Sequence, residues 1–212
     1  MIYFLSDLHS AITEGLRAYE KLRKEGDLLI ILGDVGLAFA GCEGFEGFTE
    51  EFLSLPYPIA FIDGNHENFD YLKGFPEEDF AGGRVHRLTP NIVHLMRGYV
   101  FTLEGKTFFT MGGCTSSKKW WDRGLASLED DPSEEEILRA YSSLRAHGNR
   151  VDYVLTHKYK IEENAEPNTL AALTAFIDQS VEFTHWYAGH WHVEARVDQK
   201  HTFVFDRAIP LL

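Results

Sequence analysis

Eight side chains that could bind metal ions or transfer protons occur in five short blocks of the sequence. The blocks are Asp7-x-His9, Gly33-Asp34, Gly64-Asn65-His66, the single His157 and Gly189-His190-x-His192. Imidazole nitrogens suit Zn, Fe, Ni and Cu, whereas carboxylate and amide oxygens suit harder ions such as Mn and Mg. A mixed set of this size is too large for one ion, and it suits two ions that share a carboxylate.

Two ions held close together favour one kind of chemistry. At a separation of about 3.5–4 Å they clamp the attacking and the leaving oxygen of an in-line displacement at phosphorus. They also acidify a bound water, so that metal-bound hydroxide exists near neutral pH. The residues of the blocks therefore predict hydrolysis of a phosphate ester.

The blocks follow apolar runs with the character of buried strands, at residues 1–6, 28–32, 59–62, 151–156 and 183–188. In open α/β sheets the residues beyond the carboxyl ends of the strands face one crevice, so side chains far apart in the sequence could meet there. Taken alone, each block has a simpler interpretation, because Asp7 could only cap a helix and Asp34 could only serve a turn. The five blocks together disfavour that interpretation.

Helical patterns lie between these strands. Apolar residues repeat every three or four positions over residues 11–24, and a second helix is expected to end before Pro56. Ser133 and Glu136 form a capping box, and Gly148 fits the position that follows the same helix. Asn168 is expected to cap a further helix.

The middle of the chain differs, because β-type runs at residues 85–88, 92–95, 99–103 and 107–111 follow one another without helices. We expect an antiparallel section at the edge of the sheets there, preceded by a loop over residues 77–83. Residues 112–132 predict a long loop, of a kind that is usually functional or mobile. Residues 193–197 and 202–205 predict a terminal hairpin. No repeat or linker divides the chain, so we expect one domain over residues 1–212.

The five blocks, in this order, resemble the sequence pattern of the calcineurin-like metallophosphoesterases, and they cover residues 7–192. The chain looks like the small bacterial and prophage type. That type also carries a His-Leu-x-Arg-Gly stretch (here residues 94–98), a Gly-Gly turn (112–113) and a paired Trp (120–121). The resemblance implies an α/β (α+β) fold in which two mixed β-sheets pack as a sandwich flanked by helices. It also implies a dinuclear metal-dependent phosphoesterase.

The resemblance assigns a role to each residue of the blocks. A first ion would be bound by Asp7, His9, Asp34 and His192, and Asp34 would bridge to a second ion held by Asn65, His157 and His190. His66 would bind no metal but would donate a proton to the leaving oxygen or steady the phosphate. His66 and Asp34 are thus the expected catalytic residues. For the two divalent ions we expect Mn, with Fe, Zn, Mg and Ni as alternatives.

The chain departs from part of this superfamily at two positions. Phosphoprotein phosphatases continue the Gly-Asp block with a further Asp, which orients the catalytic His, and with an Arg, which clamps the phosphate. This chain has Leu37 and Ala38 there. The orienting partner of His66 is therefore not identified, and a phosphoprotein substrate is disfavoured. We expect a small phosphate ester, a monoester or a diester, with a preference for small phosphodiesters or nucleotides.

Composition limits the alternatives. The net charge of −13 disfavours binding along a nucleic-acid backbone, although a single-strand nuclease that uses residues 118–121 stays an alternative. A catalytically silent binding module is a second alternative, disfavoured because no expected ligand is missing. No apolar run approaches the roughly 20 residues that span a bilayer, and no signal-peptide pattern is present, so we expect a cytoplasmic protein without membrane contact. Cys42 and Cys114 are expected to be unpaired thiols.

Some residues outside the blocks admit two interpretations. Trp120 and Trp121, with the basic residues near them, could stack a nucleobase or could pack on the core. Arg97 could bind phosphate, but a salt bridge is favoured. The remaining histidines are expected to be surface or hydrogen-bonded residues, with His94 as a candidate for a place near the cleft; they are His86, His94, His147, His185 and His201.

Overall fold

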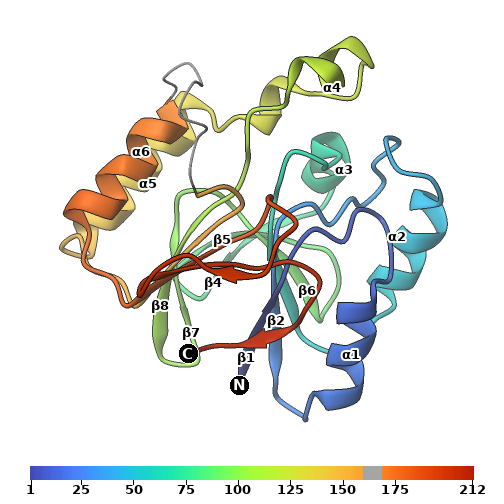
Figure 1. Cartoon of the computed structure of the whole chain (residues 1–212), viewed down its shortest axis with the longest axis horizontal. Helices are drawn as coiled ribbons and strands as arrows, with labels where there is room; N and C mark the ends of the chain where they lie inside the picture. The colour runs from blue at the N-terminus through green and yellow to red at the C-terminus, as the bar shows by residue number, and fades with distance from the viewer. Residues whose placement is uncertain (160–168) are drawn as a thin grey trace.

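The computed structural model describes residues 1–159 and 169–212 and contains two β-sheets that pack face to face (Figure 1). The first sheet has the strand order β13 (Ile209–Pro210), β1 (Ile2–Leu5), β2 (Leu28–Leu32), β3 (Ile59–Ile62), β6 (Ile92–Leu95), β5 (Gly83–Arg87) and β4 (Glu77–Phe80). The second sheet has the order β11 (Ala195–Arg196), β12 (His201–Phe203), β10 (His185–Ala188), β9 (Tyr153–Thr156), β8 (Lys106–Met111) and β7 (Val100–Leu103).

Both sheets are mixed. In the first sheet β1, β2, β3 and β6 pair in parallel, and the other pairs are antiparallel. In the second sheet β8, β9, β10 and β12 pair in parallel, and β7 and β11 pair antiparallel to their neighbours. The carboxyl ends of the parallel strands of each sheet therefore lie at a common edge, which is the requirement for gathering the five blocks.

Strand β2 shows how the core divides into layers. Successive side chains of a strand point to opposite faces, so Ile30 and Leu32 join the apolar cluster between the sheets. Leu29 and Ile31 join the cluster on the outer face of the first sheet. Because both faces are buried, this strand is an unbroken apolar run in the sequence.

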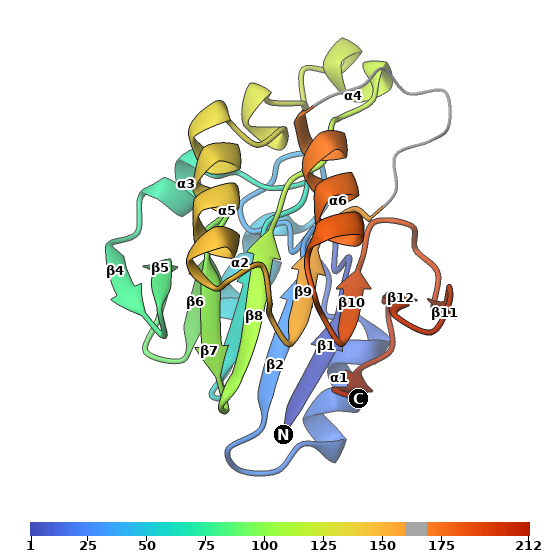
Figure 2. The same cartoon turned by 90° about the vertical axis from the view of Figure 1, so that its left-hand side faces the viewer.

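Helices cover the outer faces of both sheets. On the first sheet α1 (Glu14–Leu22) and α2 (Phe45–Leu53) contribute residues such as Leu16 and Phe52 to the outer cluster. On the second sheet α5 (Glu134–Ala146) and α6 (Thr169–Ser180) lie side by side over the face of the sheet, as Figure 2 shows. The expected sandwich of two mixed sheets flanked by helices is confirmed.

The prediction of a loop over residues 77–83 is wrong, because β4 forms the outermost strand of the first sheet. Its sequence is acidic and shows no apolar alternation; the strand pairs antiparallel with β5 along its length, and charged side chains pair across the two strands. Arg84 lies 3.1 Å from a carboxylate oxygen of Glu77, and Arg87 pairs with Glu78. Opposite charges on neighbouring strands stabilise a sheet by less than about 1 kcal/mol per pair.

The antiparallel pairings expected in the middle of the chain are present, but they are divided between the two sheets. Strands β5 and β6 pair in the first sheet, and β7 and β8 form a hairpin in the second. Beyond these hairpins, β6 pairs in parallel with β3, and β8 pairs in parallel with β9. The expected terminal hairpin is confirmed by β11 and β12, whereas the short strand β13 was not predicted.

The long segment over residues 112–132 contains two short helical pieces, α4 (Lys118–Asp122) and a 3-10 turn at Leu128–Asp130. A further short helix, α3 (Phe69–Lys73), follows the third block. The capping box of α5 is confirmed, because Ser133 and Glu136 bond reciprocally, and Gly148 has the expected left-handed backbone with φ of 65°. The expected cap at Asn168 lies outside the described residues. Within them, no helix has the length and apolar content that crossing a bilayer requires.

Candidate metal centre

The polar side chains of the five blocks lie directly beyond the carboxyl ends of strands from both sheets. Strands β1, β2, β3, β9 and β10 lead, in this order, to Asp7 and His9, to Asp34, to Asn65 and His66, to His157, and to His190 and His192. Backbone hydrogen bonds join the first two strand exits. The N–H of Asp7 donates to the carbonyl of Gly33 over 3.1 Å, and the N–H of His9 donates to the carbonyl of Asp34 over 2.9 Å.

Five of these residues have a left-handed backbone, which residues other than glycine rarely adopt. The φ angles are 58° at Asp7, 47° at His9, 52° at Asp34, 71° at His190 and 50° at His192. Such conformations cost about 1–3 kcal/mol each, and they concentrate at functional sites. Strained backbone therefore coincides with five of the eight candidate residues, and it also occurs at five non-glycine residues outside the blocks.

A first group of possible metal ligands consists of Asp7, His9 and His192, whose donor atoms lie within 4.8 Å of one another. Nε2 of His192 is 3.4 Å from Oδ1 of Asp7, and Nε2 of His9 is 2.9 Å from Nε2 of His192. Two imidazole nitrogens and a carboxylate oxygen that converge in this way could hold one divalent cation.

A second group consists of Asp7, Asp34 and His157, again with donor atoms within 4.8 Å of one another. Oδ1 of Asp34 lies 3.4 Å from Nε2 of His157, whereas Oδ2 of Asp34 lies 3.7 Å from Nε2 of His9. The two oxygens of Asp34 thus face ligands of different groups. A carboxylate in this position could be shared by two ions.

Buried polar atoms that lack a hydrogen-bond partner indicate whether these residues could hold a metal ion. In the described part of the chain, Oδ1 of Asp7, Oδ1 of Asn65 and Nε2 of His157 are buried without a hydrogen-bond partner. Buried polar atoms are nearly always bonded, so the unpartnered atoms of Asp7 and His157, which belong to one group of possible ligands, require an explanation. The opposite nitrogen of His157, Nδ1, donates to the carbonyl of Leu32 over 2.7 Å, which leaves Nε2 to bind either a proton or a metal ion. The set fits a cation.

The protonation states of His157 and Asp34 depend on each other. Burial alone would lower the pKa of His157, but the carboxylate of Asp34 outweighs burial and raises that pKa to about 9. Burial opposes ionisation of Asp34, yet the attraction of His157 holds the pKa of the carboxyl well below its usual range. A proton on His157 therefore balances Asp34, and a divalent ion bound there would displace it.

Asn65 and His190 lie at the edge of these groups. The backbone N–H of His190 donates to Oδ2 of Asp7 over 3.0 Å, and its ring lies 5.2 Å from the ring of His157. Burial, followed by repulsion from His157, lowers the pKa of His190 to about 3, so its imidazole is neutral and able to bind metal. The amide of Asn65 faces Ser116 at 3.5 Å.

Glycine is required where these loops touch. At Gly33 the φ angle is 92°, and a Cβ atom would lie 2.7 Å from Cγ of His157. At Gly64 a Cβ atom would lie 2.6 Å from the backbone nitrogen of Asp34 and would overlap its carboxylate. Both glycines occur in the Gly-Asp and Gly-Asn-His blocks, so the close approach explains why those blocks contain glycine.

His66 lies among aromatic rings beside the first group. Its ring centroid is 4.8 Å from that of His9, 5.2 Å from that of Phe39 and 4.4 Å from that of Trp120. Burial lowers the pKa of His66. Within the described residues its Nδ1 has no hydrogen-bond partner, so the orienting role of the missing acidic residue is not taken over by another carboxylate.

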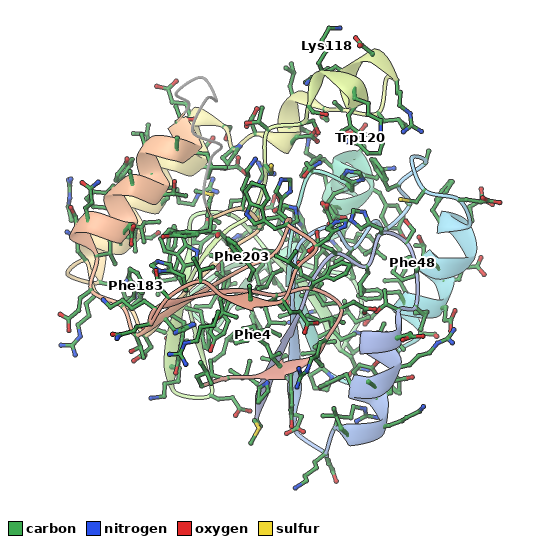
Figure 3. All side chains as sticks on the ribbon, viewed as in Figure 1. Phe4, Phe48, Lys118, Trp120, Phe183 and Phe203 are labelled. Carbon is green, nitrogen blue, oxygen red and sulfur yellow. The ribbon has the colours of Figure 1, made fainter. Side chains whose placement is uncertain are left out.

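The two aromatic residues of α4 differ in their surroundings. Trp120 rests edge-on against His66, with the guanidinium of Arg123 4.9 Å and the ammonium of Lys119 5.8 Å from the centre of its ring. Trp121 is 45% exposed, so packing of both rings on the core is ruled out. Figure 3 shows Trp120 on the side of α4 that faces the rest of the protein and Lys118 on the outer side.

Two acidic residues that flank the third block were given no role by the sequence. Glu67 accepts hydrogen bonds from the backbone N–H groups of Val35 and Gly36, at 2.9 and 3.1 Å, and so holds the turn that carries Asp34. Burial raises the pKa of Glu67 to about 8. Asp63 accepts from Nε of Arg97 at 2.7 Å. The sequence could have indicated a supporting role for both residues only through their positions next to Gly-Asn-His.

Arg97 therefore forms the favoured salt bridge, with 4% of its side chain exposed. His94 lies near the third block, since its Nε2 is 3.0 Å from Oδ1 of Asp63. The expectation that the remaining histidines would be surface or hydrogen-bonded residues holds, although only His147 is exposed. The other residues are buried with ring or hydrogen-bond partners: His86, His94, His185 and His201. Both cysteines are unpaired, as expected.

Comparison with known proteins agrees with this geometry. The family model described as calcineurin-like phosphoesterase matches residues 1–194, which include all five blocks. A search of the curated proteins found no match. Members of the matched family are metal-dependent phosphoesterases, although some are catalytically inactive. Because the match covers most of its length, the chain belongs to the calcineurin-like phosphoesterase family.

Proposed function

We propose that this protein hydrolyses a phosphate mono- or diester with the help of two divalent cations. The observation that carries the proposal is the convergence of orphaned donor atoms from both sheets around Asp34, whose two oxygens face different ligand groups. The family match supports the same class of reaction. No ligand position of the family pattern is missing, which disfavours a catalytically silent binding module.

The ligands would divide into two sets that share Asp34. Asp7, His9 and His192 would hold the first ion, and Asn65, His157 and His190 would hold the second. When bound, the two ions would supply positive charge to the phosphoryl group and would acidify water. The mixture of imidazole, carboxylate and amide donors suits Mn, with Fe, Zn, Mg and Ni as alternatives.

His66 would contact the substrate. It lies beside the first group but has no place in the proposed ligand sets, and burial favours its neutral form. The negative charge of a bound phosphate ester would favour the protonated form, because an opposite charge nearby stabilises a cation. His66 would then steady the phosphate or donate its proton to the leaving oxygen.

The surroundings of His66 support a substrate with an aromatic leaving group. Trp120 touches His66, and Arg123 and Lys119 bring positive charge to the same ring. A nucleobase could stack near Trp120 while its phosphate reached the ions. We therefore propose small phosphodiesters or nucleotides as substrates. A protein with a net charge of −13 is a poor match for a long nucleic acid.

A single-strand nuclease is the second candidate function, because α4 exposes Trp121 next to basic residues. One of them, Lys118, is already paired with Asp122 at 2.6 Å, which weakens the positive patch. Short nucleotides and polymers are therefore best separated by direct assay.

The test is an assay of the Mn²⁺-reconstituted protein on an aryl monoester, an aryl diester, nucleotides and single-stranded DNA. We expect hydrolysis of at least one small ester and little hydrolysis of DNA. Hydrolysis of DNA alone would favour the nuclease, and no hydrolysis of any substrate would favour the binding module. Buffer with Mn²⁺ and no protein is the control for uncatalysed turnover.

A further inference from the structure

A thiol lies at the edge of the proposed metal centre, where the family pattern assigns it no role. The donor atoms of His9, Cys42 and His66 lie within 4.8 Å of one another. They come from three segments: the exit of β1, the loop before α2 and the exit of β3. Cys42 is half-buried and forms no disulfide, and its thiol lies within hydrogen-bond reach of Ser10.

The donors of this cluster are chemically different from those that surround Asp34. A thiolate with two imidazoles suits soft, thiophilic ions, above all Zn²⁺, whereas carboxylates and amides suit Mn and Mg. Zn–S bonds of about 2.3 Å and Zn–N bonds of about 2.0–2.1 Å place tetrahedral donors roughly 3.3–3.7 Å apart. The cluster would therefore contract by at most about 1 Å on binding, and a water could occupy the fourth position.

A second observation points to a ligand here independently of the cysteine. His66 is 8% exposed, and in the described part of the chain its Nδ1 is buried without a hydrogen-bond partner. Leaving a buried polar group unsatisfied costs about 1–3 kcal/mol. A metal ion bonded to this nitrogen would remove the cost and would fix the ring that no carboxylate orients.

We propose that His9, Cys42 and His66 form an inhibitory site for a thiophilic divalent cation, Zn²⁺ in particular. On binding, the thiol proton passes to the solvent and the thiolate bonds to the ion. The ion would coordinate His66 and so keep it from the substrate. It would also coordinate His9, which is a proposed ligand of the first ion of the catalytic centre. The inhibitory effect rests on the proposed function, whereas the binding of Zn²⁺ does not.

Two readouts separate binding from inhibition. The first is alkylation of Cys42 by iodoacetamide, followed by peptide mass, with and without Zn²⁺. The second is the rate of ester hydrolysis by the Mn²⁺-loaded protein during a Zn²⁺ titration. The variants are Cys42→Ser, which removes the thiolate, and Glu43→Ser, a change at the exposed next residue of the same loop.

We expect Zn²⁺ to slow alkylation of Cys42 at least about tenfold in the parent protein, and His66→Ala to abolish this protection. Mutation of a residue that only hydrogen-bonds to a metal ligand typically lowers metal affinity about 10–100-fold. Removal of a ligand itself should lower the affinity for Zn²⁺ by at least as much. The Zn²⁺ concentration for half-inhibition should thus rise at least about tenfold in Cys42→Ser and stay unchanged in Glu43→Ser. Added Mn²⁺ should relieve the inhibition.

Each other outcome overturns a stated part of the proposal. Unprotected Cys42 would refute the Zn²⁺ site, whatever the activity. Protection together with equal inhibition of the parent and Cys42→Ser would refute its inhibitory role. Protection in a protein that hydrolyses no ester would support the site and refute the proposed function.

Discussion

The substitution Gly64→Ala tests whether Asp34 is the shared ligand. An added Cβ atom would lie 2.6 Å from the backbone nitrogen of Asp34 and 2.8 Å from its Cγ. Ordinary van der Waals contact begins at 3.4 Å, so the backbone of Asp34 would have to retreat by 3.4 − 2.6 = 0.8 Å. Gly64 itself has no left-handed backbone, so the effect comes from this overlap alone.

The expected loss follows from that displacement. A misplacement of about 1 Å in a catalytic group can reduce the rate about 100-fold, and overpacking typically costs about 1–3 kcal/mol of stability. We therefore expect Gly64→Ala to fold, to bind Mn²⁺ more weakly and to lose about 100-fold in kcat/KM. Hydrolysis of an aryl ester at several Mn²⁺ concentrations, with urea unfolding alongside, measures all three quantities.

The chain offers a matched control at Gly47 in α2, where an added Cβ atom would meet nothing within 4 Å. Gly47→Ala should leave activity unchanged and raise stability by about 0.5–1 kcal/mol, because alanine suits a helix better than glycine. If Gly64→Ala hydrolysed the ester at the parental rate with parental Mn²⁺ affinity, Asp34 could not be the shared ligand.

Four further predictions concern single side chains. Asp34→Asn should lower the Mn²⁺-dependent rate by more than the roughly 10–100-fold of a supporting residue, and a parental rate would refute its bridging role. His66→Ala should keep its bound Mn²⁺, measured by elemental analysis, while turnover falls about 10²–10⁴-fold; loss of metal would contradict its place outside the proposed centre. Arg97→Met should destabilise the protein by about 3–5 kcal/mol in urea unfolding, because it removes the guanidinium that neutralises buried Asp63 and leaves His94 as the remaining side-chain partner of that carboxylate, and Asp63→Asn in the same chain should recover much of the loss. Burial lowers the pKa of His185 to about 4, so the neutral ring stabilises the fold above its unfolded pKa of about 6.5, and this contribution is lost as the pH falls from 6.5 towards 4. The free energy of unfolding should therefore fall by up to about 1.4 kcal/mol per pH unit in that window, and His185→Gln should reduce the slope; an unchanged slope would show that another group is responsible.

The sequence predicted those elements whose pattern reflects the forces that hold them. Strand β2 is buried on both faces, and its unbroken apolar run showed this directly. The start of α5 was equally clear, because a capping box is a local interaction that needs no tertiary contact. The acidic strand β4 was missed, since its backbone pairing with β5 and its ion pairs with Arg84 and Arg87 leave no apolar pattern in its own sequence.

The candidate site shows the same division. Its polar residues stood out because each follows an apolar run at a strand exit. The places of Cys42 and Trp120 could not be predicted, because each lies in a segment without periodicity that approaches His66 only through the tertiary fold. The role of Glu67 could not be predicted either, although the residue directly follows the Gly-Asn-His block. Its carboxylate accepts hydrogen bonds from backbone groups more than 30 residues away.

The pairing of His9 with His192 joins positions that are 183 residues apart. A ribosome must therefore release most of the polypeptide before these two imidazoles can meet, and long-range closures of this kind form slowly. A partly made chain could fold its first strands and still be unable to assemble the complete ligand set. Recovery of metal-dependent activity during refolding would accordingly lag behind the return of secondary structure, which makes activity a reporter of the last stage of folding.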